Sequence, residues 1–242
     1  MVRSPRLTKL TYVAPLDSDS SPPMAKTSSR RSREQRTLRR RVAHRVPKRT
    51  FLVFCEGEKT EPAYLKALKR DPEVRDIASV DIRIHDESLG SAPLTLVEAA
   101  ADARARASQE ESEIDEVWCL FDVEWPKNHP NLKAALALAK TSEVNVAVSN
   151  PCFELWLVLH FQNQTASLET KPAKSLLKKH DDTGGPGLDG SVYMPLRAEA
   201  SRRARSLEKR HRGGGTKFPN DNPSSGMYRF LDAVEQTEVN PR

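Results

Sequence analysis

The sequence lacks the features that mark secreted, zinc-binding and membrane proteins. It has three cysteines, Cys55, Cys119 and Cys152, which are far apart and form no Cys-x-x-Cys pair. Neither a disulfide framework nor a zinc site is therefore expected. No apolar run approaches the roughly 20 residues that a membrane-spanning helix needs, and no signal peptide is recognisable. These absences predict a soluble protein of the reducing cytoplasm.

Two common catalytic motifs are also missing. The run Gly213-Gly214-Gly215-Thr216-Lys217 lacks the spacing and the preceding strand of a Walker A loop, so ATP hydrolysis by this chain is not expected. No serine lies in a recognisable nucleophile elbow, which argues against Ser-His-Asp chemistry.

What the chain does have is a charge divided unevenly along its 242 residues. The net charge is +6, but residues 1–50 hold 14 basic against 3 acidic residues, and residues 51–242 are net negative. Residues 1–49 lack helical or strand periodicity and are predicted to be a disordered basic tail. Within this tail, Met24 is a second candidate for the initiator methionine, besides Met1. The arginines of the tail could bind RNA or DNA, or only keep the protein in solution. They include Arg30, Arg31, Arg33, Arg36, Arg39, Arg40 and Arg41.

From residue 50 onward, strand and helix patterns alternate, which predicts an α/β domain over residues 50–237 with a mostly parallel sheet. The expected strands are Phe51–Cys55, Val80–Ile84, Val117–Phe121 and Val144–Val148. The expected helices are Glu61–Lys69, Leu94–Ala107, Leu132–Ala139, Cys152–Phe161, a short one ending at Leu176–His180, Leu196–His211 and Pro223–Val234.

Acidic side chains follow two of the predicted strands at the point where each strand ends. Glu56, Glu58 and Glu61 follow the first, and Asp122 and Glu124 follow the third. Carboxyl ends of parallel strands meet at one edge of a sheet, where open α/β sheets bind ligands. Carboxylate oxygens there suit magnesium or a similar cation, which is the usual aid to phosphodiester chemistry.

The individual acids differ in how well they support this interpretation. Gly57 directly after Glu56 permits a tight turn and an approach by phosphate. Asp122 and Glu124 are expected to share a face of the strand, where they would repel each other unless a cation or proton lay between them. Glu61, at the start of a helix, is also explained by the helix dipole alone.

Three ordered motifs resemble the RloB family. They are Cys55–Pro62, Phe121–Trp125 and Ser149–Leu157, with a weaker echo in Asn222-Pro223-Ser224-Ser225, and the likeness spans Thr50 to Val234. That family is similar to Toprim domains, the catalytic module of topoisomerases, primases and OLD-type nucleases. Its members resemble components of bacterial phage-defence loci, often beside an AAA or ABC-type ATPase.

The resemblance implies roles for particular residues. The Toprim glutamate after the first strand falls on Glu56, which would act as general acid/base or bind metal, and the Asp-x-Asp pair falls on Asp122 and Glu124. Glu124 departs from the second aspartate by one methylene, which changes the geometry of metal binding. Glu154 lies in an otherwise apolar helix and is expected either to ligate the metal or to pair with an Asn or Lys. The implied cofactor is Mg²⁺ or Mn²⁺.

Each group of basic side chains in the domain has two interpretations. Lys59, beside Gly57, is expected either to bind phosphate or to pair with Glu61. A basic face near the C-terminus would hold a nucleic-acid backbone, or would simply be solvated among Glu199 and Glu208. Its members are Arg202, Arg203, Arg205, Lys209, Arg210 and Arg212.

Two functions follow from these observations. The first is a magnesium-dependent nuclease acting on DNA or RNA in anti-phage defence, with catalytic residues Glu56, Asp122 and Glu124. The second is a non-catalytic regulator or adaptor of an ATPase, which the departure at Glu124 favours. A test of both is whether Glu56 and Asp122 lie close enough to share one cation.

Overall fold

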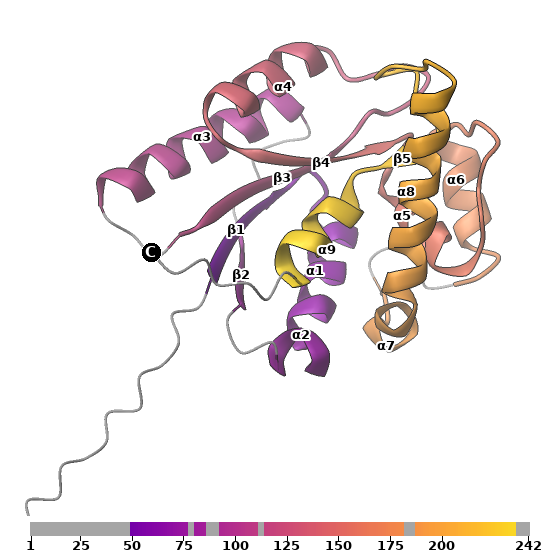
Figure 1. The fold of residues 1–242 in the computed structure, drawn as a ribbon, viewed down its shortest axis with the longest axis horizontal. Coiled ribbons are helices and arrows are strands. Elements are labelled where there is room, and N and C mark those ends of the chain that lie inside the picture. Colours follow the sequence, from indigo (N-terminus) through magenta and orange to yellow (C-terminus); the bar gives the residue numbers. More distant parts are fainter. Residues whose placement is uncertain (1–48, 77–79, 86–91, 111–113, 182–186, 236–242) are drawn as a thin grey trace, which may run out of the picture. The chain divides into compact units, whose positions relative to one another are not determined.

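The computed structural model describes residues 49–76, 80–85, 92–110, 114–181 and 187–235, all within one compact unit. The α/β fold and the mostly parallel sheet predicted from the sequence are confirmed (Figure 1). The strands are β1 (Arg49–Cys55), β2 (Val80–Ile84), β3 (Glu116–Asp122), β4 (Asn145–Asn150) and β5 (Ser224–Ser225). The helices are α1 (Thr60–Arg70), α2 (Pro72–Asp76), α3 (Pro93–Gln109), α4 (Leu132–Thr141), α5 (Phe153–Phe161), α6 (Thr170–Leu177), α7 (Gly190–Tyr193), the 3-10 turn Met194–Leu196, α8 (Arg197–Gly213) and α9 (Met227–Glu235).

The strand order is β2-β1-β3-β4-β5, and the first four strands are parallel. Parallel neighbours joined by helices put the carboxyl ends of β1 and β3 side by side, which is the arrangement predicted for the acidic clusters. The short antiparallel β5 was not predicted. It pairs Ser225 with Ser149 and Ser224 with Asn150, and two residues are too few to show a strand period.

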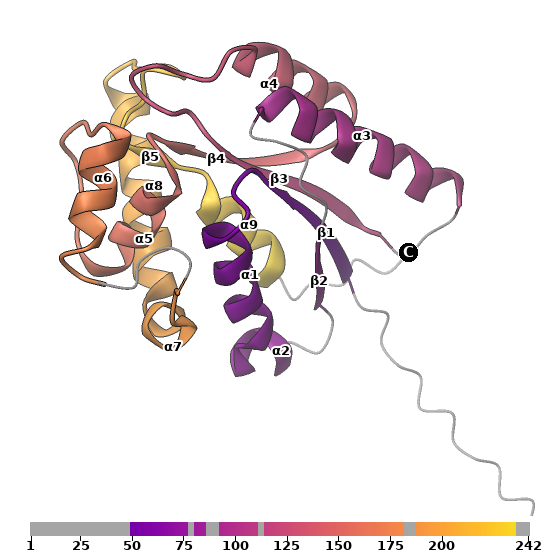
Figure 2. The same ribbon diagram turned by 180° about the vertical axis from the view of Figure 1, so that it is seen from behind.

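The two faces of the sheet are covered by different helices (Figure 2). Phe51 and Val53 of β1 face one core with α1, α5 and α9, whereas Phe54 faces the other with α3 and α4. This alternation follows from the two-residue period of a strand. In β3 the alternating residues are apolar on both sides, which explains why Val117–Phe121 is a continuous apolar run.

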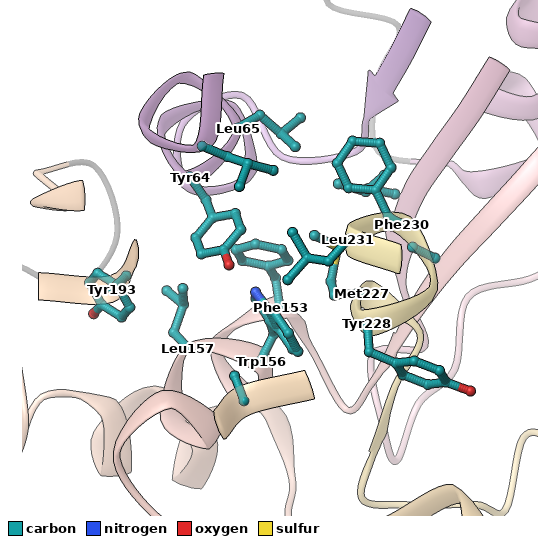
Figure 3. Packing of buried hydrophobic residues seen from close by; sticks show 14 of the residues in the cluster. Tyr64, Leu65, Phe153, Trp156, Leu157, Tyr193, Met227, Tyr228, Phe230 and Leu231 are labelled. Atoms are coloured by element: carbon teal, nitrogen blue, oxygen red, sulfur yellow. The ribbon is translucent and has the colours of Figure 1, made fainter. Parts of the chain in front are cut away.

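Helix α5 is buried on nearly all sides and anchors the larger core (Figure 3). Trp156 is fully buried and His160 is 1% exposed, so both belong to the core. From the C-terminal end, Phe230 of α9 packs edge-on against Phe51 and Trp118, with ring centroids 6.2 and 5.3 Å apart. Aromatic burial of this kind makes α9 part of the layer that covers the sheet.

Some predicted boundaries differ from those observed. The short helix expected to end at Leu176–His180 is α6, which stops at Leu177, and the last helix begins at Met227 because β5 takes up residues 224–225. The predicted disordered tail lies outside the described residues except for Arg49, the first residue of β1. Residues 236–237 of the predicted domain also lie outside them. No described helix is long and apolar enough to cross a membrane.

Candidate functional site

The carboxyl ends of β1 and β3, with the first turns of α1 and α5, surround a pocket of about 340 Å³, called here the acidic pocket. It is lined by Glu56, Gly57, Glu58, Lys59, Thr60, Glu61, Asp122, Glu124, Phe153, Glu154 and Lys174. Every acid predicted for the site therefore lies in one cavity. Glu56 and Asp122, 66 positions apart in the sequence, share it.

Glu56 is fixed at the end of β1 by two hydrogen bonds and a close histidine contact. Its backbone N–H donates to Leu120 O at 2.9 Å, which continues the ladder between β1 and β3 by one residue. Its side chain, 10% exposed, accepts from the backbone N–H of Asp122 at Oε2 over 2.8 Å. The other oxygen, Oε1, lies 2.8 Å from Nε2 of His129. The carboxylate thus spans the gap between the two strand ends.

Asp122 and Glu124 both line the pocket, but not for the reason predicted. Strand β3 ends at Asp122, and Glu124 has a φ of 59°, so the two do not share a strand face. Left-handed backbone is uncommon for a residue other than glycine, asparagine or aspartate. It turns the chain so that Glu124 reaches the pocket from a loop, where Thr170 Oγ1 donates to Oε2 at 3.3 Å.

Glu61 is a buried part of the acidic pocket, although its position in the first turn of α1 suggests only a role at the helix end. It is 5% exposed, and a β-carbon built on Gly57 would lie 2.1 Å from its Oε2. Burial raises the pKa of Glu61 to about 7, and the charges of Glu154 and Glu56 contribute to this rise. The alternative that Glu61 only complements the helix dipole does not account for this burial among other acids.

Glu154 reaches the pocket from the first turn of α5 and is 15% exposed. Its Oε1 lies 3.7 Å from Nζ of Lys174, on α6. Of the two alternatives predicted for Glu154, the structure therefore contains the pairing with a lysine. Burial works to lower the pKa of Lys174, but the charges of Glu154 and its neighbours raise it on balance.

The electrostatics of the pocket favour a bound cation. Burial raises the pKa of Asp122 well above its usual value, and the charges of Glu61 and Glu56 raise it further. Burial also raises the pKa of Glu56, while the hydrogen bond from the Asp122 backbone and the proximity of His129 oppose that rise. Several carboxylates repelling one another in one cavity are a common property of metal sites and of catalytic acids.

The donor set fits magnesium or manganese, because all its acidic side chains offer hard oxygens. Among the described residues, however, no three His, Cys, Asp or Glu side chains are already arranged around a single point where an ion could sit. The residues that would hold the ion are Glu56, Asp122, Glu124 and Glu154, and their side chains would have to turn toward it.

Of the residues predicted to bind phosphate or nucleic acid, only those predicted to bind phosphate lie at the acidic pocket. Gly57 and Lys59 line the acidic pocket, with Lys59 exposed at its rim. Within the described ranges, no ion pair joins Lys59 to Glu61. The basic residues of α8 line no part of this pocket.

Most of the α8 arginines are engaged by neighbouring groups. Arg203, 16% exposed, donates to the carbonyls of Leu159 and His160 at 2.6 and 2.7 Å and so caps α5. Ion pairs join Arg202 to Glu199, Arg205 to Asp232 and Arg212 to Glu208. Lys209 and Arg210 are exposed. Nucleic-acid binding by this face stays a prediction.

Two residues of the site were missed by sequence reasoning. His129 contacts Glu56, and Lys174 contacts Glu154. A lysine partner for Glu154 was one expectation, but nothing in the sequence pointed to position 174. His129 lies in a loop with no local pattern that connects it to Glu56, so only the tertiary structure reveals it.

The family model described as RloB-like protein matches residues 51–234. No curated protein and no solved structure matches the chain.

Proposed function

Because the chain belongs to the RloB-like protein family, we propose that it is a magnesium-dependent, Toprim-like nuclease that cleaves phosphodiesters of DNA or RNA. We also propose that it acts in the cytoplasm in anti-phage defence, together with an AAA or ABC-type ATPase. The ATPase partner and the setting come from the family resemblance alone. The catalytic part of the proposal has independent support in the acidic pocket.

The observation that carries the proposal is the convergence of Glu56, Asp122 and Glu124 on one cavity at the carboxyl edge of a parallel sheet. Buried like charges destabilise a fold unless they are protonated or neutralised. A site that keeps them is explained most simply by a cation bound during function. The edge of the sheet is also where α/β folds bind phosphate-containing ligands.

In this proposal the residues divide the work according to their contacts. Asp122 and Glu124, with Glu154 as an outer group, would hold the cation, whose charge would neutralise the phosphate as negative charge develops on it. Glu56, which is contacted at both of its oxygens, would bind the metal or accept and return a proton near the scissile phosphate. Lys59 and Lys174 supply positive charge at the rim, where a phosphate would enter.

The test is cleavage of single-stranded DNA, duplex DNA and RNA by the purified chain with magnesium and with EDTA. Glu56→Gln and Asp122→Asn should each lower the magnesium-dependent rate on the order of 100-fold or more. Glu98→Gln, an exposed acid on α3, is the matched control and should cleave like the unaltered protein. Activity that survives both pocket substitutions would reject these roles.

The basic face of α8 makes a second, separable part of the proposal. If Lys209 and Arg210 contact the nucleic-acid backbone, their joint replacement by Gln should weaken binding and reduce its salt dependence. Replacing Arg203 would not be informative, because that side chain caps α5.

Two observations favour the second candidate function, a non-catalytic regulator of an ATPase. The described acids are not already arranged around a point where an ion could sit. Glu124 also lies in a loop and has a left-handed backbone conformation. A regulator would change the hydrolysis rate of an associated ATPase to the same extent before and after the substitution Asp122→Asn. A nuclease would lose its activity with that substitution.

A further inference from the structure

The contacts of Glu56 single out a residue outside the acidic pocket. One oxygen is occupied by the backbone of Asp122, and the other lies 2.8 Å from the ring of His129. Nε2 of His129 is buried and has no hydrogen bond to any other described group, so this close contact with Oε1 is the polar interaction open to it. An ionised carboxylate oxygen only accepts, so the contact is attractive when Nε2 carries a proton. His129 is 17% exposed and does not line the pocket. It therefore contacts Glu56 from outside the pocket lining.

The loop after β3 is built to bring His129 to this position. Glu124, Asn128 and Asn131 have φ values of 59°, 56° and 64°, a left-handed conformation that asparagine tolerates well. The backbone N–H of Asn128 donates to Glu124 O, and that of His129 to Val123 O, both at 3.0 Å. The loop therefore folds back onto the end of β3.

The same loop is tied to the neighbouring strand. The backbone N–H of Val123 donates to Ser149 O, and that of Glu124 donates to Pro151 O, each at 2.9 Å. The backbone of His129 is thus hydrogen-bonded to a residue just after β3, and that segment is in turn hydrogen-bonded to the end of β4 and to Pro151. A side chain on so well connected a backbone can hold its partner in one orientation.

We propose that His129 is a positioning residue for Glu56, which fixes the carboxylate between the ends of β1 and β3 without touching the substrate. The inference rests on the proposed function, because it concerns the orientation of a catalytic carboxylate. Partners of this kind typically change activity by about 10- to 100-fold when they are lost.

The decisive comparison is between two substitutions at the same position. His129→Phe keeps a ring of similar shape but removes the donor, whereas His129→Gln keeps an N–H near the position of Nε2. The Phe variant should lower kcat for magnesium-dependent cleavage at least about 10-fold with KM for nucleic acid unchanged. The Gln variant should recover most of that loss. A residue needed only for packing would show the reverse order.

The control is His180→Phe, since His180 is an exposed histidine that stacks on Phe161. It should cleave like the unaltered protein. Equal activity of His129→Phe and this control overturns the inference, as does equal loss in the Phe and Gln variants when both are folded. Should the Phe variant fail to fold, His129→Ala with and without added imidazole replaces it. Activity that imidazole does not restore then counts against the proposal.

A measurement without catalysis separates this inference from the proposed function. The Nε2–H proton of His129 should give a solvent-protected NMR resonance that shifts in Glu56→Gln. Its absence from the unaltered protein would overturn the inference even if the protein cleaves nucleic acid. If the resonance is present and shifts but magnesium-dependent cleavage is missing, the pairing stands and the nuclease proposal fails.

Discussion

The acidic pocket and the Arg197 cluster, which is Arg197 with Asp71, Glu73 and Glu235, both gather carboxylates from distant parts of the chain. In the Arg197 cluster one buried guanidinium meets Glu235 at 2.9 Å, Glu73 at 2.5 Å and Asp71 at 3.8 Å. The acidic pocket holds six carboxylates and two lysines at its rim. Each carboxylate of the first cluster contacts a buried guanidinium, whereas the acidic pocket has no arginine among its described lining residues and its acids outnumber its lysines.

The difference shows in the ionisation of the groups. Burial works to lower the pKa of Arg197, but hydrogen bonds to Glu235 and Glu73 raise it on balance, so the charged form is stabilised. In the acidic pocket, burial and like charges raise the pKa values of Asp122 and Glu61 together. Carboxylates that share a buried cation of the chain support the fold, whereas buried carboxylates without one suggest a functional site that binds a cation.

The largest effect expected from this contrast is that the acidic pocket lowers the free energy of unfolding by an amount that depends on pH. The pKa of Glu61 rises from 4.5 to about 7 on folding. Below pH 4.5 the carboxyl is protonated in both the folded and the unfolded state, so it does not reduce stability. As the pH rises from 4.5 through about 7, the unfolded state ionises first and the free energy of unfolding falls by about 3 kcal/mol. Glu61→Gln should therefore match the unaltered protein at about pH 4 and exceed its stability by roughly that amount at about pH 8.

Urea unfolding without divalent cations, repeated across that pH range, measures this difference. Glu98→Gln, on the exposed side of α3, is the control and should show no such trend. If the stability difference for Glu61→Gln stays constant across the range, the carboxylate is not held among the other acids as described.

The Arg197 cluster should respond in the opposite sense. Arg197→Met removes the guanidinium shared by Asp71, Glu73 and Glu235, and it also removes the donor to Met194 O. Hydrogen bonds to charged groups contribute about 1.5 to 3 kcal/mol, and part of this is reduced here because Glu73 is largely exposed. We expect a loss of about 2 kcal/mol in the free energy of unfolding.

The matched control for this loss is Arg202→Met on the same helix. Arg202 pairs with Glu199 at an exposed position, where an ion pair contributes at most about 1 kcal/mol. Both variants are compared by their urea midpoints at constant pH. Equal midpoints would show that the Arg197 cluster contributes no more than a surface ion pair.

The smallest effect on stability is expected at Gly57. A β-carbon there would overlap the Glu61 carboxylate, which is the flexible end of a side chain and can move. Gly57→Ala should therefore change stability by less than about 1 kcal/mol, yet reduce the pH dependence attributed to Glu61. Gly213→Ala, where nothing lies within 4 Å of the added carbon, should leave that pH dependence intact. Unaltered pH dependence in Gly57→Ala would mean that Glu61 is not packed against Gly57.

Local sequence patterns were sufficient for much of the fold. The strand Val80–Ile84 has the predicted bounds, and β1, β3, α3 and α4 differ from prediction by at most two residues at each end. Such elements are specified by periods of 2 and 3.6 residues that neighbours in sequence carry. Glu56 and Asp122 could also be predicted to meet, because parallel strands align their carboxyl ends.

The sequence by itself therefore determined the layers, the order of acidic segments and the edge of the sheet at which they converge. Only the tertiary structure decided that Glu61 is buried among the acids and that Glu124 reaches the pocket from a loop with a left-handed backbone conformation. The same is true of the contacts that His129 makes with Glu56 and Lys174 with Glu154. His129 lies in a loop and Lys174 on α6, and each contacts an acid that belongs to a different element of the fold. Their geometry is set by how the elements pack, which no local period encodes.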